Sequence, residues 1–249
     1  MTRRSDAIDG LRGALVVLMA VYHGCYIAVL FKLVDIGLYD GFWWWFPRAI
    51  AAGFVFMSGW GLARKKARGA GFRDFARRAG RLALPAIAVS AVSALVFGKS
   101  FVFFGVLHLL AVSSLLAWPL VGRPLVAAVA GAACLGLGLW LGGMRFGWPW
   151  LAWLGFRPAG VYPVDYLPLL PWFAWCAFGS AFHDLMDRLG RQGNPAPSGI
   201  DVRETRGAVA GRSILRPLAF LGRHSLVVYL AHLPLLYGIG WVLSMLVAR

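Results

Sequence analysis

Charged and hydrogen-bonding side chains are scarce in this sequence of 249 residues. Only 14% of the residues are charged, against 60% that are hydrophobic, and the chain has a single Glu, a single Asn and a single Gln. Soluble domains are nearer a quarter charged, and disordered chains and coiled coils need many polar side chains. These shortages exclude a water-soluble globule, a disordered chain and a coiled coil. The composition predicts an all-α, polytopic integral membrane helix bundle.

Cysteine is also rare, and the commonest catalytic motifs are missing. Cys25, Cys134 and Cys176 lie inside apolar runs without C-x-x-C spacing, which indicates free thiols rather than disulfides or a zinc site. The sequence has no P-loop, no H-E-x-x-H helix and no G-x-S-x-G elbow. We therefore expect no bound metal, and neither P-loop nor serine-hydrolase chemistry.

Positive charge is abundant, and its position is informative. The net charge is +15, and the stretch 64–81 alone holds eight basic residues and one acid, a net +7. Basic residues beside membrane spans normally face the cytoplasm and its anionic lipids. Because no groove-reading motif accompanies the charge, we expect no nucleic-acid partner. Arg outnumbers Lys by 21 to 4, which is typical of a GC-rich bacterial genome.

Hydropathy divides the chain into spans of roughly 20 apolar residues. The flanking charges then favour a cytoplasmic N-terminus in a bacterial inner membrane. We expect one transmembrane domain over 1–249, with a cytoplasmic linker loop at 185–213. The segment 212–223 is partly apolar, so it predicts either an interfacial helix or an eighth span. The seven expected spans lie near 11–31, 46–63, 82–98, 102–120, 124–142, 166–184 and 224–246.

Three local patterns in the apolar regions have simple interpretations. The run 11–31 is longer than a signal-peptide core and no A-x-A cleavage site follows it, so it predicts a retained first helix. The tryptophans at 43–45 and 148–153 favour an aromatic belt at the outer interface over a sugar-stacking platform. Gly138 and Gly142 form a G-x-x-x-G pattern that indicates helix packing.

Ionisable residues in the first span are the sharpest functional signal, because such groups are costly in lipid. Asp9 and Arg12 stand at i, i+3 and can pair on one helix face. His23 follows Arg12 by eleven residues, about 16 Å along a helix, which places it near the membrane midplane. It predicts either a catalytic imidazole or a neutral histidine bonded to a backbone carbonyl.

Other polar groups could converge on the same interior. His108 lies in the fourth expected span and His232 in the last, each with a structural role as the alternative. Asp165 heads the sixth span among Pro163, Pro168 and Pro171, which disfavour a regular helix there. Irregular backbone at membrane depth is tolerated where it lines a cavity. Two further candidates flank the second expected span: Arg48 and Ser58.

Six segments in order resemble one known family. They are similar to the membrane catalytic domain of heparan-alpha-glucosaminide N-acetyltransferase and its bacterial relatives, over nearly the whole chain. The eleven-residue step from Arg12 to His23 also resembles the R-x10-H signature of the wider transmembrane acyltransferase superfamily. The segments are IDGLRG (8–13), His23, FVFMSG (54–59), GVLH (105–108), LLPWF (169–173) and LGRHSLVVYLAH (221–232).

This resemblance implies transfer of an acetyl or other acyl group from cytoplasmic acyl-CoA to an amine or hydroxyl on an amino sugar or another envelope glycan. It implies His23 as general base or acyl acceptor, with Asp9 orienting Arg12 and His108 or Asp165 completing the site. Arg12 is expected to bind a CoA phosphate, and the basic stretch after the second span to attract the polyanionic donor. The other expected donor-binding residues are Arg48, Ser58, Arg223 and His232.

We expect no lumenal domain in this chain, unlike in the enzyme that gives the family its name. The acceptor, the acyl chain and the oligomeric state, with a homodimer as one option, stay open. The alternative function is a proton-coupled transporter or flippase, in which midplane histidines and a broken sixth span form the substrate path.

Overall fold

The computed structural model describes residues 6–159, 165–193 and 209–247, and helices dominate this part of the chain. The all-helical class expected from composition is therefore confirmed. The elements are α1 (Asp6–Leu30), α2 (Gly41–Ala67), α3 (Phe72–Phe97), η1 (Gly98–Ser100), α4 (Val106–Leu116), α5 (Pro124–Gly142), η2 (Pro149–Leu154), α6 (Leu169–Gly193), α7 (Val209–Arg223) and α8 (Ser225–Val247).

Four helices in the described residues are long and apolar enough to cross a membrane. They cover Ala7–Leu30, Phe72–Ser100, Pro124–Gly142 and Ser225–Val247. At most 22% of each apolar window is buried within the chain, and large side chains such as Leu95 and Leu125 are 88% and 76% exposed. Apolar surface on this scale needs lipid to cover it. The chain is a multi-pass membrane protein.

The expected count of seven spans is matched only in part. The second expected segment falls within α2 and most of the sixth, from Leu169 on, within α6, but neither helix has the hydropathy of the four above. The fourth, 102–120, holds only the 11-residue helix α4, which is about 16 Å long and cannot cross a 30 Å hydrocarbon core alone. The partly apolar segment 212–223 belongs to helix α7. Helix α6 continues through Gly193, so it enters the linker predicted at 185–213. Residues 194–208 lie outside the described part.

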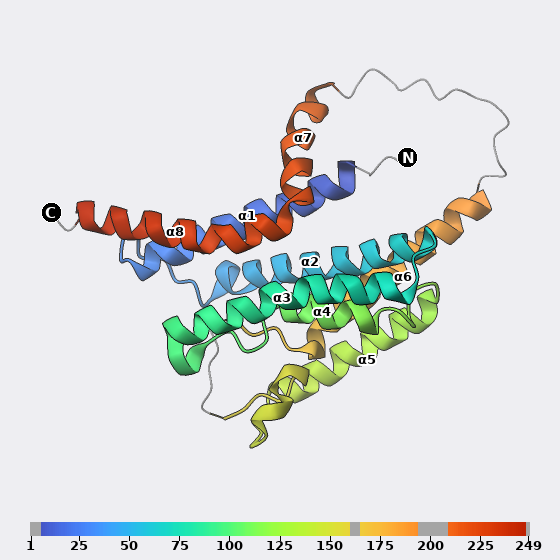
Figure 1. Cartoon of the computed structure of the whole chain (residues 1–249), viewed down its shortest axis with the longest axis horizontal. Helices are drawn as coiled ribbons and strands as arrows, with labels where there is room; N and C mark the ends of the chain where they lie inside the picture. Colours follow the sequence, from blue (N-terminus) through green and yellow to red (C-terminus); the bar gives the residue numbers. More distant parts are fainter. Residues whose placement is uncertain (1–5, 160–164, 194–208, 248–249) are drawn as a thin grey trace. The chain divides into compact units, whose positions relative to one another are not determined.

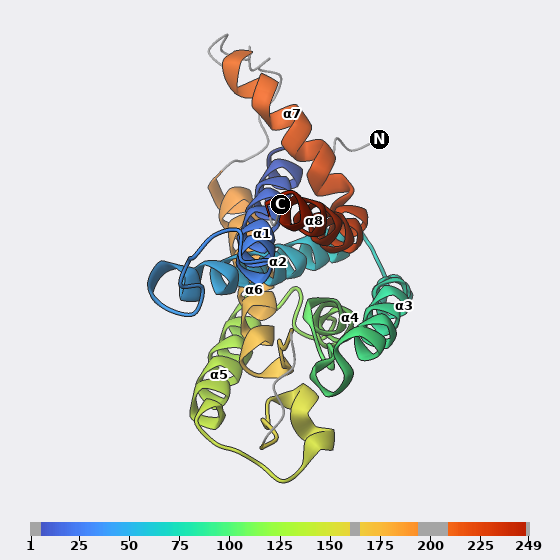
Figure 2. The same cartoon turned by 90° about the vertical axis from the view of Figure 1, so that its left-hand side faces the viewer.

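The described helices belong to two compact units. The first joins Met1–Phe54 to Gly199–Arg249, so it contains α1, the first half of α2, α7 and α8. Within it α1 and α8 run side by side, and α7 packs on α1 (Figures 1 and 2). Glycines permit both contacts: Gly13 lies against the Leu218 backbone of α7, and Gly240 of α8 against Ile27 and Phe31 of α1.

The second unit, Val55–Ser198, holds the rest of α2 with α3, α4, α5 and α6. Helix α5 packs along α6, α3 packs along α4, and α4 also contacts α6 (Figure 2). Helices α2 and α6 meet through glycine, with Gly59 against the Cys176 backbone and Gly179 against the Phe56 backbone. The apolar core of this unit includes Val55, Leu62, Phe75, Leu109, Phe173 and Cys176.

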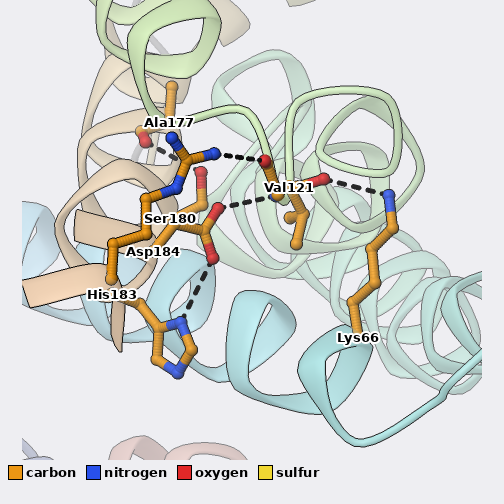
Figure 3. Close-up of polar contacts among 8 residues, drawn as sticks. Lys66, Val121, Ala177, Ser180, His183 and Asp184 are labelled. Carbon is orange, nitrogen blue, oxygen red and sulfur yellow. Dashed lines mark hydrogen bonds and ion pairs between the residues drawn. The ribbon is translucent and has the colours of Figure 1, made fainter. Parts of the chain in front are cut away.

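Polar contacts fix the turn between α4 and α5 (Figure 3). The Lys66 ammonium donates to the carbonyls of Trp118 and Val121 at 2.9 and 3.0 Å, which satisfies carbonyls that follow the end of α4. From α6, Asp184 accepts from the Gly122 N–H at 2.6 Å and contacts the His183 ring. Gly122 has φ of +89°, a conformation that favours glycine. These polar groups stabilise the turn between the two helices.

Candidate functional site

The two predicted midplane histidines lie against each other in the first unit. His23 on α1 and His232 on α8 have ring centroids 4.9 Å apart in an edge-to-face arrangement, and the His232 Nε2 is 3.2 Å from the His23 Nδ1. His232 is only 6% exposed. The bare Gly240 of α8, packed on Ile27 of α1, keeps these helices close enough for the contact. Both histidines were predicted as site residues, although not as a pair.

The hydrogen bonds of this pair determine which ring nitrogens carry protons. The His232 Nδ1 is 2.6 Å from the Tyr229 carbonyl, and a carbonyl only accepts, so this nitrogen carries a proton. In the neutral ring the His232 Nε2 is then an acceptor, and it accepts from the His23 Nδ1–H. The Met19 carbonyl, 2.9 Å from the same Nδ1, requires the same proton. His23 therefore carries its lone pair on Nε2.

The predicted ion pair at the start of α1 is present. Arg12 and Asp9 approach to 3.6 Å, and the Asp9 side chain is buried while that of Arg12 is partly exposed. Gly222, the residue before the exposed Arg223 in α7, lies against the backbone of Asp9 and Gly13. The pair thus stands where α7 docks on α1, about 16 Å along the helix from His23.

The predicted donor-binding residue Arg48 has local contacts on its own helix. Its guanidinium lies 3.3 Å from the centre of the Trp44 ring and donates to the Trp44 carbonyl. Stacking of arginine on tryptophan combines cation–π attraction with apolar contact. These contacts hold Arg48 on the aromatic first half of α2.

Aromatic rings gather beside His23 in the same unit. The Tyr22 ring lies edge-on to the His23 ring, with the ring centroids 5.5 Å apart. Its centroid is 6.4 and 6.3 Å from those of Trp43 and Phe46 of α2. Phe42 stacks on Phe46 at 4.9 Å. We call these four residues, Tyr22, Phe42, Trp43 and Phe46, the aromatic cluster. It joins the tryptophan-rich start of α2 to the histidine pair.

His108 and Asp165 meet at the N-terminus of α4 in the second unit. The Gly105 N–H donates to the His108 Nδ1 at 3.3 Å, so the proton of the neutral ring is on Nε2, 3.3 Å from the Ser90 hydroxyl. The Asp165 carboxyl lies against Gly105 and accepts from the Val106 N–H. Both nitrogens of His108 are engaged in hydrogen bonds, and its Nδ1 caps the N-terminus of α4. Asp165 accepts a hydrogen bond at the same N-terminus of α4.

Ser58, a predicted site residue, accepts a hydrogen bond from Arg78, an arginine that the sequence did not single out. Arg78 on α3 donates to the Ser58 hydroxyl of α2 at 3.0 Å and to the Ser114 hydroxyl of α4 at 2.8 Å. The sequence places Arg78 in a basic stretch typical of a topology signal. Its i, i+3 spacing from the buried Phe75, which places both residues on one side of α3, was the available clue.

A cleft of about 400 Å³ lies beside this arginine. It is formed by the end of α2 and the first turns of α3 in the second unit. Four of its five lining side chains are basic, so the cleft concentrates positive charge. The lining residues are Lys65, Asp74, Arg77, Arg78 and Arg81.

The partly buried position of Asp165 affects how the stability of the protein depends on pH. Loss of hydration raises the pKa of its carboxyl to about 6, and the hydrogen bond from Val106 N–H opposes the rise. The folded protein therefore holds this proton between pH 4 and 6, where the unfolded chain releases it. The free energy of unfolding should fall as pH rises through this window and then level off, a loss of up to about 3 kcal/mol.

The Asp165→Asn variant should lose this pH dependence, because the amide stays neutral and its oxygen can still accept from Val106. We expect it to be more stable than wild type at pH 8 and to differ little at pH 4. Thermal unfolding in detergent at pH 4 to 8 measures both curves. If stability depends on pH in the same way in wild type and Asp165→Asn, the Asp165 carboxyl titrates as in water and the prediction is wrong.

The fold and the site together define a multi-pass helical membrane protein with a partly buried, oriented imidazole. The chain belongs to the family described as "heparan-alpha-glucosaminide N-acetyltransferase, catalytic", which matches residues 4–234. Comparison with curated proteins and with solved structures gives no significant match. The family is one of acetyl-CoA-dependent N-acetyltransferases, so the chain is an enzyme of this class, and the resemblance seen in its motifs is confirmed.

Proposed function

We propose that this protein transfers the acetyl group of cytoplasmic acetyl-CoA to the amine of an amino sugar in the cell envelope, with the His23 Nε2 as the reacting nitrogen. The proposal places the chain in a bacterial inner membrane, N-terminus in the cytoplasm. One observation carries the mechanism: the hydrogen bonds from His23 Nδ1 to Met19 and His232 leave the Nε2 lone pair unprotonated. A general base or a nucleophile needs this tautomer.

In direct transfer, the neutral amine of the acceptor attacks the thioester carbonyl carbon and the C–S bond breaks. The His23 Nε2 takes the proton that the amine loses, and the proton returns to the CoA thiolate as the product leaves. In the two-step route the same Nε2 attacks the thioester first, and the amine then takes the acetyl group from the acetyl-imidazole. Both routes begin at the same lone pair.

His232 has a positioning role in this scheme. It was expected to contact the donor, but its Nδ1 is bound to the Tyr229 carbonyl and its Nε2 faces His23. When His23 gains a proton at Nε2, its Nδ1–H remains directed at the His232 Nε2 acceptor. The pair therefore keeps the ring oriented through the reaction, as a second group does for the base in catalytic triads.

The remaining residues support the two substrates. Asp9 holds Arg12 by their ion pair, which leaves Arg12 oriented for an anionic part of the donor. Rings such as Tyr22 and Trp43 present the apolar, polarisable faces on which the C–H faces of a pyranose stack, and Tyr22 contacts His23 directly. The sequence favoured an aromatic belt at Trp43, but the contact of Tyr22 with His23 supports the aromatic cluster as our proposed acceptor side of the site.

The test is acetyl transfer by the purified full-length protein in liposomes. With labelled acetyl-CoA outside and glucosamine inside, the proposal predicts N-acetylglucosamine carrying the label, and none when protein-free liposomes are used. Labelled glucosamine supplied without acetyl-CoA tests the alternative function, a proton-coupled transporter or flippase. If unmodified sugar crosses the bilayer with protons and no acetyl product forms, the protein is a transporter and the proposal is wrong.

A further inference from the structure

The basic cleft of the second unit has the charge and construction of a phosphate site. Its walls carry Lys65 from α2 and three arginines from α3, against one carboxylate, Asp74. That carboxylate is already engaged: it accepts from the Gly71 N–H at 3.1 Å and lies 3.4 Å from the Arg77 guanidinium. The cleft therefore carries an excess of positive charge that an anionic ligand can neutralise.

The arrangement of the arginines is set by the helices and by polar anchors. Arg77 and Arg81 stand at i, i+4 and so share one face of α3. Arg78 is fixed by the Ser58 and Ser114 hydroxyls, at 3.0 and 2.8 Å. Both serines are buried, at 5% and 0% exposed. A topology signal needs only charge near the membrane surface, whereas this guanidinium is held in one orientation by two other helices.

We infer that this cleft binds a phosphate-bearing ligand, and that the ligand is the nucleotide end of the acetyl-CoA donor. This assignment of the ligand rests on the proposed function. Arginine forks bind phosphate oxygens in pairs, and a volume of about 400 Å³ is in the range of small-molecule sites. The 3′-phosphate and diphosphate of CoA supply the negative charge that the four basic residues require. The headgroup of an anionic phospholipid is the other source of the same chemistry.

The experiment uses adenosine 3′,5′-bisphosphate, which carries phosphates like those of CoA but no thioester. Its Kd is measured on full-length protein in detergent, for wild type and the double variant Arg77→Gln/Arg81→Gln. The matched control is Arg73→Gln, because Arg73 is an exposed arginine of α3 that does not line the cleft. Arg78 is left intact because its contacts with Ser58 and Ser114 join three helices.

We expect the double variant to raise the Kd at least about 10-fold, since each lost charge-assisted bond to phosphate weakens binding severalfold. The control should stay within about twofold of wild type. An unchanged Kd in the double variant, or an equal rise in Arg73→Gln, overturns the site. If the bisphosphate does not bind but phosphatidylglycerol vesicles do, and only with Arg77 and Arg81 present, the occupant is a lipid headgroup and the donor assignment is wrong.

Acetyl transfer separates this inference from the proposed function. Cleft-dependent binding of the bisphosphate by a protein that transfers no acetyl group supports the phosphate site and overturns the function. Acetyl transfer with an unchanged KM for acetyl-CoA in the double variant overturns the cleft as donor site and leaves the function standing.

Discussion

Replacing His23 with glutamine should slow acetyl transfer by at least about 100-fold while leaving the affinity for acetyl-CoA unchanged. Glutamine is close to histidine in size, but its amide nitrogen has no lone pair that takes a proton. General base catalysis contributes about 10²- to 10⁴-fold, and nothing else in the mechanism replaces the Nε2. The rate constant kcat from liposome assays and the Kd for acetyl-CoA in detergent measure the two effects separately.

His224→Gln is the matched control for this prediction. His224 is exposed, and its Nδ1 contacts the Phe220 carbonyl at 2.9 Å near the junction of α7 and α8. We expect its kcat to stay within about twofold of wild type. If the His23 variant keeps more than about a third of the wild-type kcat, His23 is not the reacting base. If it loses donor binding instead, its role is in recognition.

The Gly179→Val variant should fail to form a stable fold. Helices α2 and α6 approach so closely that a Cβ at Gly179 would collide with the Phe56 carbonyl and lie 3.1 Å from the Trp60 nitrogen. Overpacking usually costs about 1 to 3 kcal/mol, and here the obstacle is helix backbone, which cannot rotate away as a side chain does. We expect a loss at or above this range, visible as a lower Tm or as loss of protein after purification.

Gly190→Val on the same helix is the control, because nothing lies within 4 Å of a Cβ built at Gly190. It makes the same substitution in open space, so its Tm should stay close to that of wild type. Equal losses in both variants would mean that helix propensity, and not the contact between α2 and α6, determines the result.

Much of the local structure could be predicted because it depends on residues close in sequence. The Asp9–Arg12 pair follows from helical spacing, and the structure contains it. The prolines near Asp165 predicted irregular backbone, and residues 165–168 precede the start of α6 at Leu169. The G-x-x-x-G pattern was correct for Gly138, which packs on Pro171, but nothing lies within 4 Å of a Cβ built at Gly142.

What could not be predicted depends on contacts between distant segments. His23 and His232 were both selected by their depth in lipid, yet their pairing spans 209 residues and needs the packing of α8 on α1. Arg78 resembled any other charge in a basic stretch until Ser58 and Ser114 were brought to it. Hydropathy also overestimated the fourth span, because the apolar residues at 102–105 are not helical and only α4 follows them.

The central claim is that His23 presents an unprotonated Nε2 while His232 accepts from its Nδ1. Nitrogen NMR of the full-length protein with ¹⁵N-labelled histidine measures this directly, with the His23 signals assigned by their loss in His23→Gln. The account predicts a protonated Nδ1 and an unprotonated Nε2 for His23 near neutral pH. A proton on Nε2, with a bare Nδ1, would contradict the arrangement and remove the basis for catalysis at this ring.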